Sequence, residues 1–320
     1  MQEQLIKRAK ELLADGTVQK VVGWKKGLFE DDITPAVFNS AEELDKDFVF
    51  NKFCKANLSK YLVKITREIE VAKSTTRMNN TMAKQRDPNA KAKPIPQAVV
   101  LVFLKPSDTY SFTQLLKENR ITRGDVYAIG VPCQDTLDGG EVCDNCKNKK
   151  PVSCDELIGI EADVEPVEST RMAEVAKLEA MTADERDAFW KNEFSRCLRC
   201  NACRDICPAC TCEKCVFDNN KLYTSQKVAE TNFEESLFHI IRAWHVAGRC
   251  TDCGECSRVC PQHIPLYLLN RKFIKDINEI YGEYQAGSDM ETKPAMLTFN
   301  AEGDPETTIV YDRSHDKEAE

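Results

Sequence analysis

The sequence predicts a multi-domain chain of the α+β/α class, with an N-terminal α/β domain that contains a parallel βαβ unit and a C-terminal domain that is all helical. Two observations predict this division. The first half alternates short β-rich segments with helical patterns, whereas the second half carries two cysteine runs separated by a segment of helical periodicity. The expected parts are an α/β domain at residues 1–160, an acidic helical connector at 161–190, a helical domain at 191–285 and an acidic tail at 286–320.

The N-terminal half is expected to begin with an amphipathic helix over residues 1–16. Strands are predicted over 18–24, 98–104 and 125–131, with a helix over 111–118 between the last two. A strand, a helix and a strand in close succession are typical of a parallel βαβ unit. In such sheets the functional crevice lies beyond the carboxyl ends of the strands, which is where Lys105 and Cys133 fall.

Two copies of one cysteine pattern dominate the second half. Residues 197–208, the first cysteine run, and residues 250–261, the second cysteine run, both read C-x2-C-x2-C-x3-C-P. This is the bacterial ferredoxin pattern, in which three thiolates hold one 4Fe-4S cluster and the fourth holds the other cluster. Structural zinc, the alternative, uses two separated cysteine pairs and has no need of three evenly spaced thiolates followed by a proline.

The pattern therefore predicts two 4Fe-4S clusters with crossed ligands. Cluster 1 would take Cys197, Cys200, Cys203 and Cys260, and cluster 2 would take Cys250, Cys253, Cys256 and Cys207. Five arginines stand within one or two residues of these ligands: Arg196, Arg199, Arg204, Arg249 and Arg258. They are expected either to stabilise the more negative reduced clusters or simply to solvate helix faces.

The long segment between the two runs favours an all-helical ferredoxin arrangement over small β-hairpin lobes. Thr231 and Glu234 form a capping box at the start of a helix. A single apolar stripe follows and is expected to face the core: Phe233, Leu237, Ile240, Ile241 and Trp244. On this interpretation Trp244 packs in the core and is not an electron-transfer stepping stone.

A third cysteine group lies in the first half and begins at the end of the last predicted strand. Its members are Cys133, Cys143, Cys146 and Cys154. Four thiolates on one irregular loop are hard to explain as packing, because buried free cysteines lie among apolar neighbours on regular elements. The group predicts a third 4Fe-4S cluster, with zinc on the same four thiolates as the alternative.

The remaining cysteines are Cys210, Cys212 and Cys215, directly after the first run, and the isolated Cys54. Three thiolates in the 210–215 segment lack a local fourth ligand. Cys54 would complete a fourth set of four, so a fourth cluster is suggested by arithmetic alone. Taken by itself, Cys54 is better explained as a buried helix cysteine.

Composition excludes several classes of function. The net charge of −8 argues against nucleic acid as a partner. Residues 73–93 are locally basic and are expected to form a solvated loop, with a docking site for an anion or a partner as the alternative. The sequence shows no secretory signal, so the thiols are expected to stay reduced in the cytoplasm. It contains no apolar stretch that predicts a direct membrane span. With four histidines and no readable Ser, His and Asp arrangement, acid–base or nucleophilic catalysis finds no support.

At this point the residues resemble a known group. Val22-Gly23-Trp24, residues 53–62, residues 127–133 and the later Cys143, Cys146 and Cys154 resemble the beta-subunit family of deazaflavin-dependent hydrogenases and formate dehydrogenases. The second half, where Gln-His-Ile-Pro-Leu follows the second run, is similar to the helical dicluster ferredoxin domains of heterodisulfide reductase. Together these resemblances cover roughly residues 18–285. They imply an electron-conducting subunit of an anaerobic redox complex, with FAD in the α/β domain of many beta-subunit relatives.

The sequence favours one function over two others. The leading hypothesis is a subunit of a formate dehydrogenase, hydrogenase or heterodisulfide reductase type of complex, which relays single electrons between a catalytic subunit and a redox partner without substrate chemistry of its own. An FAD-bearing reductase subunit, which would convert hydride into single electrons, is the alternative. It is disfavoured because residues 105–109 lack the glycine-rich turn expected near a flavin phosphate. A structural iron–sulfur scaffold or sensor is the third hypothesis.

Overall fold

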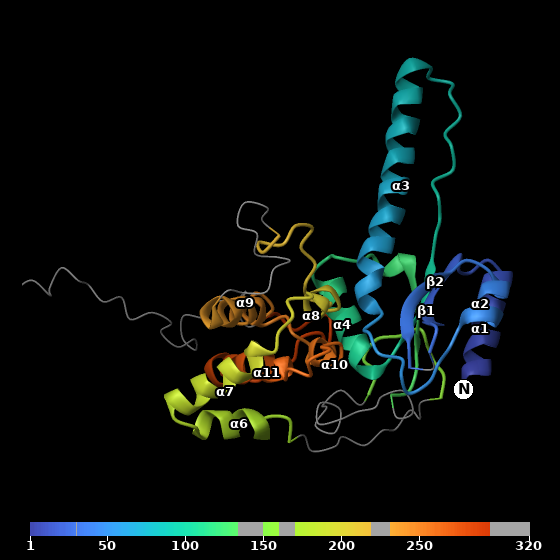
Figure 1. Ribbon diagram of the computed structural model, residues 1–320. Helices are drawn as coiled ribbons and strands as arrows, with labels where there is room; N and C mark the ends of the chain where they lie inside the picture. The colour runs from blue at the N-terminus through green and yellow to red at the C-terminus, as the bar shows by residue number, and fades with distance from the viewer. Residues whose placement is uncertain (30, 134–149, 160–169, 219–230, 295–320) are drawn as a thin grey trace, which may run out of the picture.

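A five-stranded sheet organises the N-terminal half of the computed structural model, which describes residues 1–29, 31–133, 150–159, 170–218 and 231–294. The strands are β1 (Lys20–Lys26), β2 (Ile33–Phe38), β3 (Val100–Leu104), β4 (Val126–Gly130) and β5 (Glu156–Leu157), in the order β2-β1-β3-β4-β5. Only β1 and β2 pair antiparallel, and the other neighbours are parallel. Figure 1 shows α1 (Gln2–Ala14) and α2 (Ala41–Asp47) on one side of the sheet.

The predicted βαβ unit is confirmed. β3 and β4 are parallel in the register Val100↔Val126 to Leu104↔Gly130, and α4 (Pro106–Lys117) connects them. The helix begins earlier than the expected residue 111, because Pro106 suits the first turn of a helix. All five residues of β3 are buried, as expected for a parallel strand that is covered on both faces.

The long helix α3 (Ser59–Arg86) corrects the prediction for the basic stretch. Residues 73–86 are helical rather than a loop, and Figure 1 shows the distal part of α3 projecting away from the rest of the chain. Lys73 is buried and forms an ion pair with Asp125, so one of the basic side chains anchors the helix. At the far end, Asn80 exchanges two hydrogen bonds with the backbone of Lys93 and holds the returning chain against the helix.

The described residues of the second half confirm the predicted all-helical fold. Its helices are α6 (Ala173–Ala180), α7 (Ala183–Ser195), α8 (Ala202–Asp205), α9 (Asn232–His245), α10 (Glu255–Arg258) and α11 (Leu266–Tyr281). α6 lies in the range expected for a connector, yet its Val175 and Leu178 pack against Tyr267 and Leu268 of α11. The domain boundaries themselves stay predictions.

The first part of the expected acidic tail lies against α4. A Cβ on Gly287 would come within 1.9 Å of the Tyr110 carbonyl oxygen, so this chain segment touches the helix closely and needs a glycine, whose φ is +74° here. Lys117 also donates a hydrogen bond of 2.5 Å to the Thr292 carbonyl oxygen. Residues 295–320 of the expected tail lie outside the described residues.

Candidate iron–sulfur site

The two cysteine runs fold into loops of matching shape. Arg199 and Asp252, each two residues after the first cysteine of its run, have φ of 50° and 58°. Asn201 and Gly254, each four residues after it, have φ of 62° and 73°. Left-handed backbone is unfavourable for most residues, so its recurrence at matching positions indicates a shared structural requirement.

That requirement is met by backbone N–H groups that point at sulfur. The Arg199 N–H lies 3.4 Å from Cys197 Sγ and donates to it. At the matching positions of the second run, burial raises the pKa of Cys250 and Cys253, while the backbone N–H groups of Asp252 and Glu255 oppose that rise. Hydrogen bonds of this kind stabilise a thiolate, which is the form that binds iron.

Two small cavities group the cysteines of the runs. One is lined by Cys197, Cys200, Cys203 and Cys260, the set expected for cluster 1. The other is lined by Cys207, Cys250 and Cys253, three of the four expected for cluster 2. The fourth cysteine of each run therefore lies with the first cysteines of the other run, and the described thiols are all free of disulfides. This arrangement fits crossed 4Fe-4S sites, and the ligand assignment stays a prediction.

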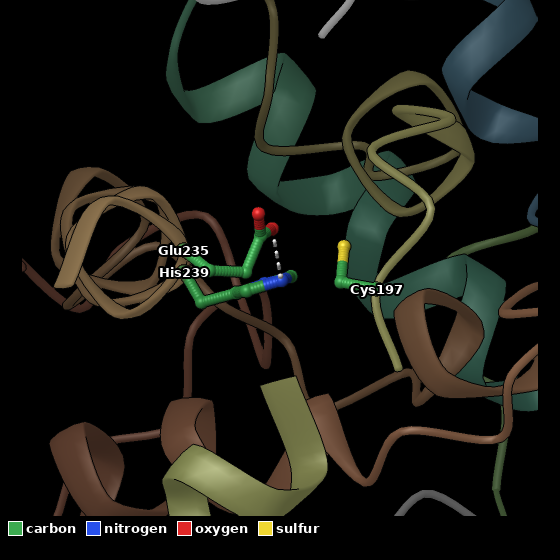
Figure 2. A group of neighbouring side chains, drawn as sticks. All are labelled: Cys197, Glu235 and His239. Atoms are coloured by element: carbon green, nitrogen blue, oxygen red, sulfur yellow. Dashed lines mark ion pairs between the residues drawn. The ribbon is translucent and has the colours of Figure 1, made fainter. Parts of the chain in front are cut away.

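His239 and Glu235 of α9 lie beside Cys197, as Figure 2 shows. The Cys197 Sγ and one ligand atom of each of these two side chains all lie within 4.8 Å of one another. Arg199 holds the Glu235 carboxylate through two contacts of 3.1 Å, so this carboxylate is already paired. The trio is therefore better explained as the surroundings of Cys197 than as a separate metal site.

The electrostatics of this corner keep the Glu235 carboxylate ionised and the His239 ring neutral. Burial would raise the pKa of Glu235, but its contacts with His239 and Arg199 outweigh burial and lower that pKa to about 2. Burial lowers the pKa of His239 and keeps its ring neutral, with one N–H to donate. His239 is 1% exposed and lines the Cys197 cavity, and its Nε2 lies 3.5 Å from Glu235 Oε1. Its Nδ1 has no hydrogen-bond partner among the described residues.

The predicted apolar stripe of α9 has the opposite orientation in the structure. Phe233 and Trp244 are 72% and 63% exposed, so Trp244 does not pack in the core. The buried face consists of Glu235, Phe238, His239, Arg242 and Ala243. The prediction was wrong about the face because it assumed an apolar core, whereas this helix packs against a cysteine-rich site that polar and cationic groups can stabilise.

The five arginines singled out in the sequence are all paired with carboxylates. The pairs are Arg196–Glu193, Arg199–Glu235, Arg204 with Asp205 and Asp218, Arg249–Glu118 and Arg258–Glu255. A carboxylate therefore compensates each of these positive charges and weakens its electrostatic effect on the cysteines. Sequence reasoning missed Arg242, which is 4% exposed and donates from Nη1 to the Cys203 carbonyl oxygen over 3.0 Å. It lies far from either run in the sequence, and the apolar stripe of the same helix drew attention to the other face.

The third cysteine group is described only in part. Cys133 follows β4 and Cys154 precedes β5, and both are half-buried. A Cβ on Gly130 would lie 3.4 Å from Cys154 Sγ, so this thiol reaches the end of β4 near Cys133. Cys143 and Cys146 lie outside the described residues. The third cluster stays a prediction.

The cysteines of the tentative fourth set lie in different surroundings. Cys210 hydrogen-bonds to Cys207 and lowers the pKa of that thiol to about 6, while Cys212 is exposed. Cys54 is fully buried, on a loop rather than on the expected helix. Its Sγ accepts from the Asn51 N–H at 3.2 Å and donates to the Val49 carbonyl oxygen at 3.6 Å. Burial raises the pKa of Cys54 to about 11. The fourth cluster stays a prediction.

The carboxyl edge of the sheet, where a crevice was expected, is filled by the second cysteine run. Lys105 Nζ lies 3.3 Å from Glu255 Oε1 and 3.8 Å from Asp108 Oδ2, and all three side chains are fully buried. Glu255 stands between Cys253 and Cys256 and also accepts from the Ala56 N–H at 3.0 Å. The charge of Lys105 is therefore neutralised by the helical half of the same chain.

Comparison with known proteins gives the class of this cysteine-rich region. Residues 193–264 match the 4Fe-4S dicluster domain. The chain therefore contains a domain of this class, which implies two 4Fe-4S clusters and electron transfer.

The relatives are distant. The chain is 34% identical over 106 residues to the F420-dependent formate dehydrogenase subunit beta of Methanocaldococcus jannaschii. This alignment covers 33% of the chain and 27% of the relative. For the F420-dependent formate dehydrogenase 1 subunit beta of Methanococcus maripaludis the identity is 31% over 107 residues, which covers 33% of this chain and 26% of the relative. For the putative oxidoreductase YgfK of Escherichia coli K12 it is 28% over 103 residues, which covers 31% of this chain and 8% of the relative.

These matches confirm the resemblance to formate dehydrogenase beta subunits as distant homology. The chain spans about a quarter of the length of the two beta subunits that it matches. Among the described residues, no helix has both the length and the apolar character that crossing a bilayer requires.

Proposed function

We propose that this chain is an iron–sulfur electron-transfer subunit that relays single electrons between a catalytic subunit and a redox partner in an anaerobic oxidoreductase complex. The observation that carries the proposal is the grouping of the cysteines of the 4Fe-4S dicluster domain around two cavities. When bound, 4Fe-4S clusters supply one-electron chemistry at potentials that the surrounding protein adjusts. The eight cysteines of the two runs would hold them.

The chain's own residues would position the clusters and limit their contact with water. Phe194 and Ile264 are buried beside cysteines of both runs and give the site an apolar wall. The backbone N–H of Arg199 and the neutral ring of His239 offer donors to sulfur on the cluster 1 side. On the cluster 2 side, Asn270 Nδ2 lies 3.5 Å from Cys256 Sγ. Such outer contacts tune a metal site as much as its direct ligands do.

The proposed partners are a catalytic and a redox subunit, in a complex of the formate dehydrogenase, hydrogenase or heterodisulfide reductase type. The names of the two beta-subunit relatives support the first of these types. Apolar side chains exposed on α3 and α9 support the presence of protein partners, because a subunit of a complex leaves such surfaces uncovered when alone: Val71, Met78, Met82, Phe233, Leu237 and Trp244.

Chemical analysis of anaerobically purified chain tests the proposal. About eight irons per chain would correspond to the two clusters of the runs, about twelve to a third cluster at the Cys133 group, and about sixteen to a fourth. After reduction with dithionite, electron paramagnetic resonance should show reduced-cluster signals. A colourless preparation, or zinc in place of iron and acid-labile sulfide, would contradict the proposal. Flavin released in stoichiometric amount would support the FAD-bearing reductase instead.

A pair of cysteine variants makes the ligand assignment testable. Cys200→Ser should remove iron from the first site, because Cys200 lines the cavity expected for cluster 1. Cys212→Ser changes an equally small, exposed cysteine outside both runs and should keep the full signal of the two clusters. Full retention of iron in Cys200→Ser would show that the assignment is wrong, whereas iron loss in Cys212→Ser would point to the fourth cluster.

A further inference from the structure

Arg242 is a buried cation without a carboxylate partner among the described residues. Its side chain is 4% exposed, its Nη1 donates to the Cys203 carbonyl oxygen, and its Nε makes no hydrogen bond. The arginines next to the cysteine runs all have such a partner. An uncompensated buried charge is strongly destabilising, so a negative group must lie near this guanidinium when the protein functions.

Cysteines of both runs influence the charge of Arg242. Burial lowers its pKa, but the electrostatic effect of Cys203, Cys256 and Cys207 outweighs burial and raises that pKa above the ordinary value. Cys203 belongs to the cavity expected for cluster 1, whereas Cys207 belongs to the cavity expected for cluster 2. Cys203, whose carbonyl oxygen accepts from Arg242, also lies in one buried cluster with Cys256 of the second run, so the guanidinium is close to cysteines of both expected clusters.

The position of Arg242 follows from the buried face of α9. Glu235, His239 and Arg242 recur at intervals of four and three residues, so they lie on the same side of the helix. Glu235 and His239 meet the first run at Cys197, and Arg242, one turn further on, meets it at Cys203, which lies in one buried cluster with Cys256 of the second run. One helix thus supplies charged groups to both sites.

We propose that Arg242 is the shared counter-charge of the two clusters and that it raises the reduction potential of both. The inference rests on the proposed function, because it requires both clusters to be present. A 4Fe-4S cluster held by four thiolates is anionic, and each reduction adds one negative charge that a nearby buried cation stabilises. Because one guanidinium serves both sites, it also lowers the cost of holding an electron on each cluster at once.

Redox titration of the intact chain, followed by electron paramagnetic resonance, tests this proposal. Arg242→Gln should lower the equilibrium constant for one-electron reduction of both clusters by at least about tenfold, which corresponds to about 59 mV. Arg242→Lys keeps the charge and should stay within about threefold of the wild type. Iron and sulfide content is measured for each variant alongside the potentials.

A matched control removes an arginine together with its partner. The Glu193→Gln/Arg196→Gln double variant deletes an ion pair that lines neither cavity, without changing the net charge, and should leave both potentials in place. Unchanged potentials in a fully loaded Arg242→Gln protein would overturn the inference, as would equal shifts in Arg242→Gln and Arg242→Lys. Cluster loss in Arg242→Gln alone would support the need for a cation, whereas loss in both variants would indicate a packing role and overturn it. Wild-type chain without clusters would instead refute the proposed function.

Discussion

At the scale of single residues, the most unusual carboxyl group is Asp108. Burial raises its pKa from 3.8 to about 6 despite the nearby Lys105, and its Oδ2 has no hydrogen-bond partner among the described residues. A carboxyl whose folded pKa lies above its unfolded value favours the protonated form. Its destabilising effect is therefore absent below pH 3.8, grows as the pH rises through about 6 and is complete at neutral pH.

We predict that Asp108→Asn raises the thermal stability of the chain at pH 7 by up to about 3 kcal/mol. The gain should shrink as the pH is lowered toward 5, and melting curves of the anaerobic protein would measure it. Asp289→Asn is a control of opposite sign, because backbone hydrogen bonds lower the pKa of Asp289 to about 2. A destabilised Asp108→Asn at pH 7 would show that the charged form is required.

Cys54 offers a second test at this scale. Its raised pKa and its hydrogen bond to Val49 describe a neutral thiol in the core. Cys54→Ala should therefore keep the wild-type iron content and cost about 1 kcal/mol of stability, the scale of one small buried group. Iron analysis of the purified variant checks this prediction. A loss of about four irons would instead assign Cys54 to a cluster.

The spacing of the cysteines predicted the four thiols that line one cavity and three of the four expected at the other, because ligand geometry restricts such patterns tightly. The residues around them could not be predicted in the same way. Glu235, His239 and Arg242 reach the first run across more than thirty residues of sequence, and no local pattern encodes that approach. They lie on an amphipathic helix whose apolar stripe predicted that the other face is buried, whereas the structure buries the face with the charged side chains.

At the scale of elements, α9 shows why periodicity identified a helix but not its orientation. The expected helix and its Thr231 cap are present, with the Glu234 N–H donating to Thr231 Oγ1. An apolar stripe normally faces the core. Here Leu237 and Trp244 are exposed, while Phe238 is buried next to Phe217 and His239. The cysteine-rich surface against which α9 packs, rather than the hydropathy of the helix, therefore determines which face of α9 is buried.

Two substitutions on α9 separate the predicted from the observed orientation. Phe238→Ala should destabilise the chain by about 3–5 kcal/mol, because it opens a cavity beside the first run. Trp244→Ala should change stability by less than about 0.5 kcal/mol, because the ring is mostly solvent-exposed in the isolated chain. Chemical denaturation measures both values. A reversed order would place the apolar stripe inside after all.

At the scale of the whole molecule, the two halves are joined through buried polar contacts. Lys105 at the end of β3 pairs with Glu255 of the second run, and the hydroxyls of Ser111 and Thr251 lie 2.7 Å apart. The sequence predicted the βαβ unit, and it predicted the helical half with its cysteine runs. It did not predict the junction, because each half was interpreted as a separate domain and the crevice at Lys105 was expected to be open.

We predict that Lys105→Met destabilises the chain by about 3 kcal/mol, since it leaves the buried carboxylates of Glu255 and Asp108 with less compensation. Restoring neutrality with Glu255→Gln in the same chain should recover part of the loss. A double-mutant cycle measured by denaturation gives the coupling energy. Additive effects of the two substitutions would show that the ion pair does not join the halves.

The position of Glu255 between two cysteines of the second run limits how this domain can be used outside its parent chain. Besides Arg258 of the same run, its side chain contacts Lys105 and the Ala56 N–H, both of which come from the N-terminal half. A fragment cut to residues 193–264 would retain every expected iron ligand of the two runs, yet it would expose this acid next to the second cluster. The chain therefore differs from a self-sufficient ferredoxin, and engineers who graft its cysteine region elsewhere need to supply the contacts that Ala56 and Lys105 make as well.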